Sequence, residues 1–294
     1  MTQLYQLVSN CDPDISSVVR GTMITSDRRV GIEVELENIT NRHTSQWWDC
    51  IRDDSLRNNG REFVFKRPVA GVDVEKAIRG LVKMLRSESQ QVSIRTSTHI
   101  HVDVRDFSVE QLGNLILLYA ACESYIYTLG GKHRYDNIYC PGMTSSQQLL
   151  SQAAEIVSGS NSTILDKLHR WCKYSGLNLG SIPVHGSVEF RMFEGYSTPH
   201  LLTQWVKCVT KLVDVAFGMP REQVLECIAD DPIRSIFGDH SIDPEITNKN
   251  KQNAIFLAYS VDIYNDTVSG REEATPTTDK EAVLAQIRAL ALGE

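Results

Sequence analysis

The stretch that most constrains this chain is Val30–Glu37, which reads V-G-I-E-V-E-L-E. Its apolar residues alternate with glutamates, and a period of two is typical of a β-strand with one buried and one polar face. Glu33, Glu35 and Glu37 then share the polar face at a spacing of roughly 7 Å. Carboxylates that close repel one another unless cations or hydrogen-bond donors lie among them. Two explanations are open at this point: the solvated face of an edge strand, or a row of oxygen ligands for Mg²⁺ or Mn²⁺.

The composition is that of an ordinary globular protein, with 294 residues, 41% hydrophobic and 23% charged. A net charge of −7 provides no overall attraction for nucleic acid or an anionic membrane. The net charge does not exclude a local basic pocket. The start of the chain lacks the pattern of a signal peptide, and no apolar run approaches the ~18 residues of a membrane span. The seven cysteines are scattered without a C-x-x-C pair, which is typical of reduced thiols. We therefore expect a cytoplasmic protein with no membrane partner.

A second alternating strand is predicted within Ile94–Val104, around the sequence T-H-I-H-V-D-V. His99, His101 and Asp103 lie on its polar face, opposite an aliphatic face. A single histidine on a strand is usually structural. Two at positions i and i+2 on one polar face favour contact with a metal or a phosphate.

Two further strand regions carry polar residues of the same kind. Trp47–Ile51 and Arg61–Lys66 are predicted to form a hairpin, since Asn58-Asn59-Gly60 between them is a strong turn signal. This hairpin carries Asp54 at its start and Glu62 on its return strand.

Gly186–Gly195, which reads G-S-V-E-F-R-M-F-E-G, is the other strand. Glu189 and Arg191 share its polar face. They are explained either by an in-sheet salt bridge, which contributes little, or by a metal ligand beside a phosphate-binding group.

Helices are predicted between and after these strands. Gly71–Ser89 is amphipathic, and Ser108 with Gln111 forms a capping box before a largely apolar helix that ends near Leu129. Another helix begins at Thr198-Pro199 and continues to about Phe217. The Gly- and Tyr-rich loop 130–143 places Lys132 and Arg134 where they could reach an anionic ligand, although an ordinary exposed basic loop explains them equally well.

Beyond Gly218 the periodic signal weakens. We predict a catalytic domain over residues 1–219 and a mainly helical C-terminal appendage over 220–294, with a flexible linker near 267–278. The chain contains neither a Walker-type loop nor a G-x-G-x-x-G loop.

If the predicted strands lie side by side in one antiparallel sheet, their polar faces merge into one surface. That surface carries Glu33, Glu35, Glu62, His99, His101, Glu189 and Arg191. Several carboxylates with imidazole suit two or three hard divalent cations, and the arginine suits a transferring phosphate. The set fits ATP chemistry without a P-loop.

The motifs G-I-E-V-E, D-x₇-E, T-H-I-H-V-D and V-E-F-R occur here in the order seen in carboxylate-amine ligases of the glutamine synthetase and glutamate-cysteine ligase superfamily. The chain most resembles the compact amidoligase branch common in bacterial and phage genomes. The elements R-Y-D-N-I-Y-C and L-N-L are also similar to that branch. The resemblance spans roughly Arg29–Phe217.

This resemblance implies an α+β fold, a curved antiparallel sheet with helices packed on one face, like the glutamine synthetase catalytic domain. It implies metal ligands at Glu33, Glu35, Glu62, His99 and Glu189, with Asp54 at a loosely aligned acidic position. Cofactor binding is expected at His101, Arg191, Lys132 and Arg134, and catalysis at Arg191, Glu35 and Glu189. Arg191 corresponds to the arginine that stabilises the transferred γ-phosphoryl group. Glu37 has no counterpart in the pattern.

The implied reaction uses ATP and Mg²⁺ (or Mn²⁺) to activate a carboxylate as an acyl phosphate, which an amine then attacks to form an amide. The partners expected are ATP, a carboxylate donor such as glutamate or a peptide, and an amine acceptor; the acidic balance disfavours nucleic acid. Two alternatives are a zinc-dependent hydrolase that uses His99-x-His101 and a catalytically inactive binding module. The predominance of carboxylates disfavours the first, and the complete polar face disfavours the second.

Overall fold

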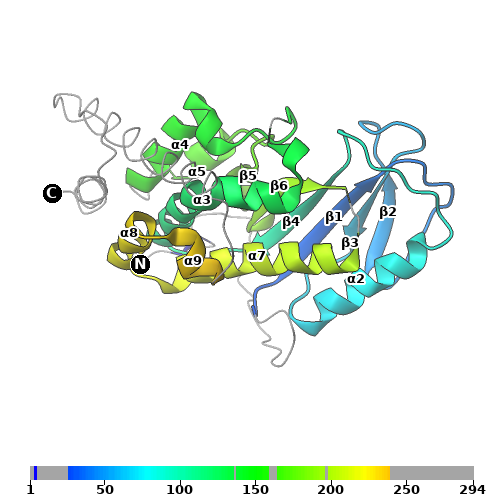
Figure 1. The fold of residues 1–294 in the computed structure, drawn as a ribbon, viewed down its shortest axis with the longest axis horizontal. Coiled ribbons are helices and arrows are strands. Elements are labelled where there is room, and N and C mark those ends of the chain that lie inside the picture. The colour runs from blue at the N-terminus through cyan, green and yellow to red at the C-terminus, as the bar shows by residue number, and fades with distance from the viewer. Residues whose placement is uncertain (1–2, 5–25, 136, 159–163, 196–197, 239–294) are drawn as a thin grey trace.

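The computed structural model describes residues 3–4, 26–135, 137–158, 164–195 and 198–238, drawn in colour in Figure 1. In this part of the chain the strands form one sheet in the order β2-β3-β1-β4-β6-β5, and every neighbouring pair is antiparallel. The strands are β1 (Val30–Leu36), β2 (Trp48–Arg52), β3 (Arg61–Phe65), β4 (Ser97–Asp103), β5 (Leu177–Asn178) and β6 (Ser187–Glu194). The prediction of an α+β fold with an antiparallel sheet is confirmed.

The glutamate-rich strand β1 lies inside the sheet, between β3 and β4. The explanation of its glutamates as the solvated face of an edge strand is therefore wrong. An interior strand has neighbours on both sides, so its polar face becomes the middle of a larger polar surface.

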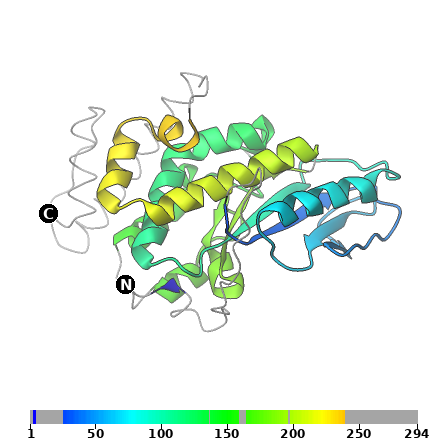
Figure 2. The ribbon, with the colours of Figure 1, turned by 90° about the horizontal axis from the view of Figure 1, so that it is seen from below.

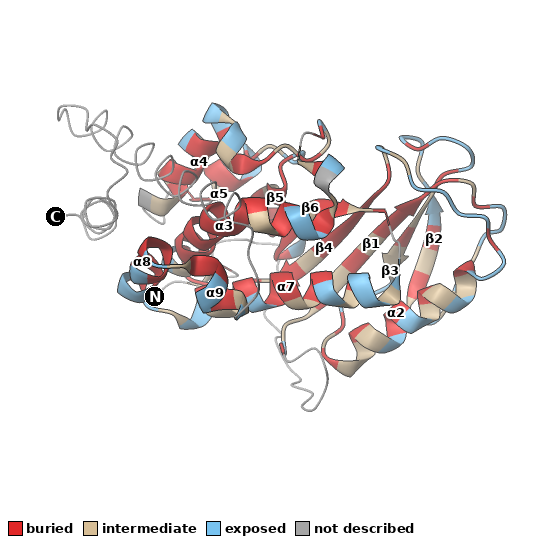
Figure 3. Ribbon diagram, in the orientation of Figure 1, coloured by how far each residue is buried: buried red, intermediate tan, exposed pale blue. Residues whose placement is uncertain are grey.

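Three long helices cover the other face of the sheet (Figures 1 and 2). They are α2 (Val72–Leu85), α3 (Val109–Gly130) and α7 (Pro199–Gly218), and α7 packs on β4 while α3 packs on β6. Figure 3 shows α3 buried along most of its length, as its nearly continuous apolar sequence predicts.

The core lies between these helices and the aliphatic faces of the strands. Ile32, Val34, Ile100, Val102 and Phe190 are all fully buried there. Burying one such side chain contributes about 1.5–3 kcal/mol, so this face fixes which side of each strand is turned away from the core. The glutamates and histidines at the alternate positions are turned toward the opposite face as a result.

Local signals place the elements as predicted. The hairpin β2–β3 turns through Asn58 and Asn59, whose φ angles of 50° and 56° lie in the left-handed region that asparagine tolerates. The Ser108 side chain accepts a hydrogen bond from Gln111 N, and the reciprocal bond completes the predicted capping box of α3. Thr198 caps α7 through Leu201 N, with Pro199 at the first helical position.

The chain between α3 and β6 contains a series of mostly short elements. They are 3₁₀ helices at Lys132–Arg134, Met143–Ser145 and Leu179–Ser181, and helices α4 (Gln147–Ser158), α5 (Ile164–His169) and α6 (Ile182–His185). Of these, α4 packs on α3, and the 3₁₀ helix at Leu179–Ser181 packs on β6. After α7, helices α8 (Arg221–Ala229) and α9 (Pro232–Phe237) pack against α3.

The linker predicted near 267–278 lies outside the described residues, and the division of the chain at 219/220 stays a prediction. Among the described helices, none combines the length and the apolar character needed to cross a membrane.

Candidate active site

The register of the central strands brings the predicted polar residues into neighbouring positions. The cross-strand pairs are Glu33 with His99, Glu35 with Glu62, and His101 with Glu189. Directly opposed residues in an antiparallel sheet have side chains within contact distance. Seven of the residues proposed from the sequence, Glu33, Glu35, Glu62, His99, His101, Glu189 and Arg191, thus share one face of four adjacent strands.

Glu33 lies at the centre of this group. Its Oε2 is 3.1 Å from His99 Nδ1, and its Oε1 is 3.3 Å from His101 Nε2. Burial works against the charged form of this carboxyl, but the charges of His101 and His99, with the hydrogen bond to His99, outweigh burial and hold the pKa of Glu33 well below its usual range. Glu33 is therefore ionised at neutral pH.

Glu35 and His99 are joined through a serine that the sequence motifs did not single out. Ser97 Oγ donates to Glu35 Oε2 at 2.5 Å and lies 2.7 Å from His99 Nε2. All three side chains are buried. The chain of contacts from Glu35 through Ser97 and His99 to Glu33 fixes the orientation of the His99 ring.

Glu189 is held at both carboxylate oxygens. Asn178 Nδ2 donates to its Oε2 at 2.6 Å, and Arg191 Nη1 donates to its Oε1. Burial opposes the ionised form, whereas the charges of His99 and Arg191 favour it and lower the pKa of Glu189. Asn178 also accepts a hydrogen bond from Gly180 N, so β5 and the following 3₁₀ helix position this carboxylate.

His101 is oriented by two hydroxyl groups. Its Nδ1 lies 3.1 Å from Ser187 Oγ and 3.2 Å from Ser181 Oγ. Its Nε2 faces Glu33 and Glu189 but is buried without a hydrogen-bond partner among the described residues. Buried polar atoms are rarely left without a partner, so this nitrogen, like Arg191 Nε, is available to a ligand.

Glu62 lies on the side of the cluster away from Arg191. Burial disfavours its charge, and the negative charges of Glu33 and Glu35 add to this effect, so the pKa of Glu62 rises to about 8. A carboxyl whose pKa is raised by burial and by neighbouring carboxylates marks a place where a cation would be stabilised.

The described residues contain two groups whose ligand atoms lie within 4.8 Å of one another, Glu33–Glu62–His99 and Glu33–His101–Glu189. Both combine carboxylates with an imidazole and share Glu33. Carboxylate-rich sets suit hard cations such as Mg²⁺ and Mn²⁺, and the unpartnered His101 Nε2 belongs to one of the groups. The donor set fits two divalent cations.

The remaining predicted site residues are not brought into this cluster. Asp54 lies in the exposed turn after β2 and pairs with Arg52 at 2.6 Å, with both side chains more than three-quarters exposed. Arg134 is buried and donates to the backbone oxygens of Thr96 and Arg191, so it supports β4 and β6 from within the protein. Lys132 belongs to the 3₁₀ helix before Tyr135, and its side chain is outside the described part of the structure.

Glu37, which continues the glutamate ladder, has a structural role. Its Oε1 accepts a hydrogen bond from Arg57 N at 2.9 Å, and its backbone pairs with Gln91. It therefore anchors the turn between β2 and β3 rather than joining the cluster.

A cleft of about 470 Å³ opens beside the cluster. The sheet contributes Glu33, His101, Asn178, Glu189 and Arg191 to its lining, and the chain from the end of α5 to the end of α6 contributes His169, Trp171, Lys173, Gly180, Ser181, Val184 and His185. The sequence motifs contain the residues of the sheet, with Asn178 in L-N-L but given no role there, and none of the residues of the other set. A cleft of this size beside charged residues can accept a small ligand.

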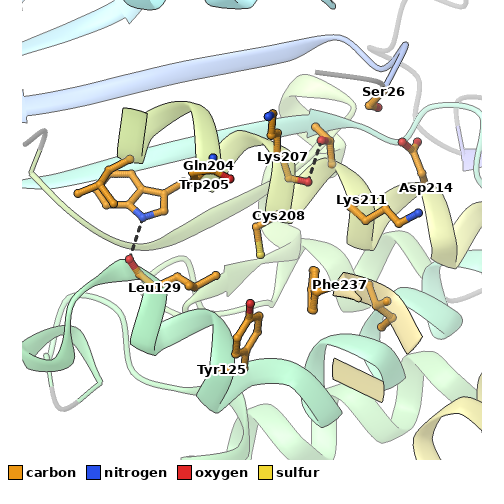
Figure 4. Close-up of a pocket in the computed structure, with 13 residues that line it drawn as sticks. Ser26, Tyr125, Leu129, Gln204, Trp205, Lys207, Cys208, Lys211, Asp214 and Phe237 are labelled. Atoms are coloured by element: carbon orange, nitrogen blue, oxygen red, sulfur yellow. Dashed lines mark hydrogen bonds between the residues drawn. The ribbon is translucent and has the colours of Figure 1, made fainter. Parts of the chain in front are cut away.

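Another cavity, of about 600 Å³, lies between α3, α7 and α9 (Figure 4). Figure 4 shows Tyr125, Cys208 and Phe237 around it, with Lys207 and Lys211 along α7. It contains none of the residues of the polar cluster, so the chemistry of the site belongs to the smaller cleft.

A comparison with known families finds a match to the family described as "Putative amidoligase enzyme" over residues 52–213, a little more than half of the chain. The matched region contains Glu62, His99, His101, Glu189 and Arg191, while β1 with Glu33 and Glu35 precedes it. No curated protein matches the chain.

Proposed function

Because this chain belongs to the amidoligase enzyme family, we propose that it is an ATP- and Mg²⁺-dependent ligase that joins a carboxylate to an amine through an acyl phosphate. The observation that carries this proposal is the cluster on one sheet face, in which Glu33 lies within 3.3 Å of both His99 and His101 and Arg191 donates to Glu189.

Two divalent cations would be held by Glu33 with Glu62 and His99, and by Glu33 with His101 and Glu189. Glu35 lies beside the first group through Ser97 and His99. Bound there, the cations would neutralise phosphate oxygens and polarise the phosphoryl group for attack. This is the support that a transferring phosphoryl group requires when no P-loop is present.

The proposed reaction has two steps. An oxygen of the substrate carboxylate attacks the γ-phosphorus, so that a C–O–P linkage forms while ADP leaves. The amine nitrogen then attacks the carbonyl carbon, the C–O bond to phosphate breaks, and the nitrogen loses a proton. Each step moves negative charge to phosphate oxygens, so a fixed cation beside them lowers the barrier.

Arg191 is the side chain best placed for that role. Its Nη1 is fixed by Glu189, and its Nε has no hydrogen-bond partner among the described residues. Because Asn178 and Arg191 hold the two oxygens of Glu189, the arginine is positioned before a ligand arrives. Glu189 thus belongs to one of the two cation groups and also orients Arg191.

Calorimetric titration with ADP, with and without Mg²⁺, tests the proposal on the wild type, Glu33→Gln and Arg191→Gln. We expect Mg²⁺-dependent binding that falls at least tenfold in each variant, since Glu33 belongs to both cation groups. Asp54→Asn removes an exposed carboxylate from the neighbouring turn and is the matched control, with binding unchanged.

Thermal melts of all four proteins separate loss of binding from loss of fold. Absence of Mg²⁺-dependent binding in a folded wild type, together with stoichiometric zinc in the purified protein, would refute the ligase and favour a hydrolase that uses His99 and His101.

A further inference from the structure

Ser97 joins two residues of the candidate site from within the sheet. It lies on the polar face of β4, and it is buried together with Glu35 and His99. Ser97 Oγ donates to Glu35 Oε2 at 2.5 Å and lies 2.7 Å from His99 Nε2. A serine hydroxyl has one proton, and here that proton is directed to the carboxylate. The contact with His99 therefore requires that the N–H of Nε2 donates to the oxygen of Ser97.

The other nitrogen of the His99 ring faces charged groups. Its Nδ1 lies 3.1 Å from Glu33 Oε2 and 3.4 Å from Glu189 Oε1. Arg191 Nη1 is also 3.4 Å from Nδ1, and an arginine nitrogen can only donate. When the ring is neutral and carries its proton on Nε2, Nδ1 has a lone pair. A lone pair at this position suits both the arginine and a cation held by the two carboxylates.

His101 shows the reverse arrangement. Ser181 Oγ and Ser187 Oγ lie 3.2 Å and 3.1 Å from its Nδ1, and its Nε2 faces the carboxylates of the cluster. The two rings thus turn different nitrogens toward those carboxylates. Two hydroxyls hold the ring of His101, whereas among the described residues Ser97 is the one hydroxyl at the ring of His99. The orientation of His99 therefore depends on a single serine.

We propose that Ser97 is a positioning residue that makes Nδ1 of His99 the atom that binds a divalent cation. The inference rests on the cation site of the proposed function. A histidine binds a metal through an unprotonated nitrogen, and the hydrogen bond of its other nitrogen decides which one is unprotonated. Glu35 directs the proton of Ser97, so this carboxylate contributes to cation binding through the serine and the ring. Ser97 sets the tautomer of His99 as well as its orientation.

The tautomer is measured by long-range ¹H–¹⁵N correlation NMR of the full chain with ¹⁵N-labelled histidine, in Mg²⁺ at pH 8. His99→Gln identifies the His99 signals among those of the eight histidines. In wild type we expect the proton of His99 on Nε2 and none on Nδ1. Ser97→Ala should give a mixture of the two tautomers, and Ser97→Thr, which keeps the hydroxyl, should retain the wild-type pattern. A proton on Nδ1 of wild-type His99 would overturn the proposal.

Calorimetric titration with Mn²⁺, without nucleotide, tests the consequence for cation binding. Ser97→Ala should bind Mn²⁺ about tenfold more weakly than wild type, the usual effect of losing a group that orients a metal ligand, and Ser97→Thr should restore most of the affinity. The matched control is Thr98→Val, on the opposite face of the same strand. It removes a buried hydroxyl that has no hydrogen-bond partner among the described residues, and it should change neither the tautomer nor the affinity. Thermal melts establish that each variant is folded.

The outcomes separate this inference from the proposed function. Equal Mn²⁺ affinity of wild type and a folded Ser97→Ala would overturn the positioning role, whether or not ADP binds. If Mn²⁺ binding depends on Ser97 but ADP does not bind with Mg²⁺, the ligase proposal falls and the role of Ser97 stands. If ADP binds with Mg²⁺ but the proton of His99 lies on Nδ1, the ligase proposal stands and this inference falls. Absence of Mn²⁺ binding by wild type would refute both.

Discussion

Replacing Glu62 by glutamine should stabilise the metal-free protein, although Glu62 belongs to the candidate site. The side chain is half-buried and faces Glu33 and Glu35, and burial together with their charges raises its pKa to about 8. Glutamine has nearly the same shape but carries no charge. The substitution therefore removes a repulsion that folding creates.

The size of the effect follows from proton linkage. The unfolded chain loses the Glu62 proton near its ordinary pKa of 4.5, whereas the folded protein keeps it until about pH 8. When the pKa of a group is higher in the folded protein than in the unfolded chain, its contribution to stability is fully present below the unfolded pKa. That contribution is lost as the pH rises through the folded pKa. The full slope is about 1.4 kcal/mol per pH unit. Because Glu62 is partly exposed to solvent, we reduce this slope to roughly half, which gives a total change of about 2 kcal/mol between the unfolded and the folded pKa.

Urea unfolding at pH 5, 6, 7 and 8 with EDTA measures this difference. We expect the stability advantage of Glu62→Gln over wild type to increase with pH and to level off above about pH 8. Asp54→Asn, which removes an exposed carboxylate from the same hairpin, should show no such increase. A pH-independent difference, or a variant less stable than wild type at pH 8, would refute the reasoning. With saturating Mg²⁺ we expect wild type to be more stable than Glu62→Gln, because the variant lacks a ligand for the cation.

Three further changes test other parts of the structure. Glu88 is buried and accepts hydrogen bonds from the 40–43 loop. Burial alone would raise its pKa, but these hydrogen bonds outweigh burial and lower the pKa to about 2. The ionised Glu88 therefore stabilises the fold above pH 4.5, and this contribution is lost as the pH falls toward about 2. By urea unfolding, Glu88→Gln should therefore cost about 2 kcal/mol at pH 7 and less than half as much at pH 3, and an equal cost at both pH values would contradict this. Asn178→Ala should weaken Mg²⁺-dependent ADP binding about tenfold in calorimetry, because Glu189 loses one of its two donors, and should lower the melting temperature because two buried hydrogen bonds are lost. Unchanged affinity in a folded variant would argue against the positioning role. Ile100→Ala should cost about 2–5 kcal/mol in urea unfolding because the side chain is fully buried beneath the cluster, and a cost below 1 kcal/mol would show a loosely packed core.

The polar face could be predicted from the sequence because the direction of a strand side chain is a local property. Ile100 and Val102 are buried by the helices, so His99 and His101 must lie on the opposite face whatever the partner strands are. The same rule extends to Ser97 and Ser187, which continue the alternation of β4 and β6. The two-residue alternation of the strands would therefore have been enough to predict that these two serines lie on the polar face.

Residues outside regular strands could not be placed in this way. Asp54 lies in a turn, where spacing along the chain does not determine the direction of a side chain, and it pairs with Arg52 in solvent. Arg134 occurs in a sequence typical of an exposed basic loop, yet its guanidinium is buried against the carbonyls of two strands. Its position depends on how α3 meets β4 and β6, which is tertiary information. The contribution of Asn178 depends on a two-residue strand at the sheet edge, too short for any periodic signal.

The two candidate cation groups share Glu33 but differ in how their charges are balanced. In the group with His101 and Glu189, Arg191 and Asn178 already occupy the oxygens of Glu189. In the group with Glu62 and His99, the nearby Glu35 receives one hydrogen bond from Ser97, and burial together with its negative neighbours raises the pKa of Glu62 to about 8. A cation entering beside Glu62 would replace its proton and be matched by three carboxylate charges, whereas one entering beside Glu189 would compete with an arginine. We therefore expect a larger electrostatic gain from a divalent ion on the Glu62 side, and expect a phosphate to bind on the Arg191 side.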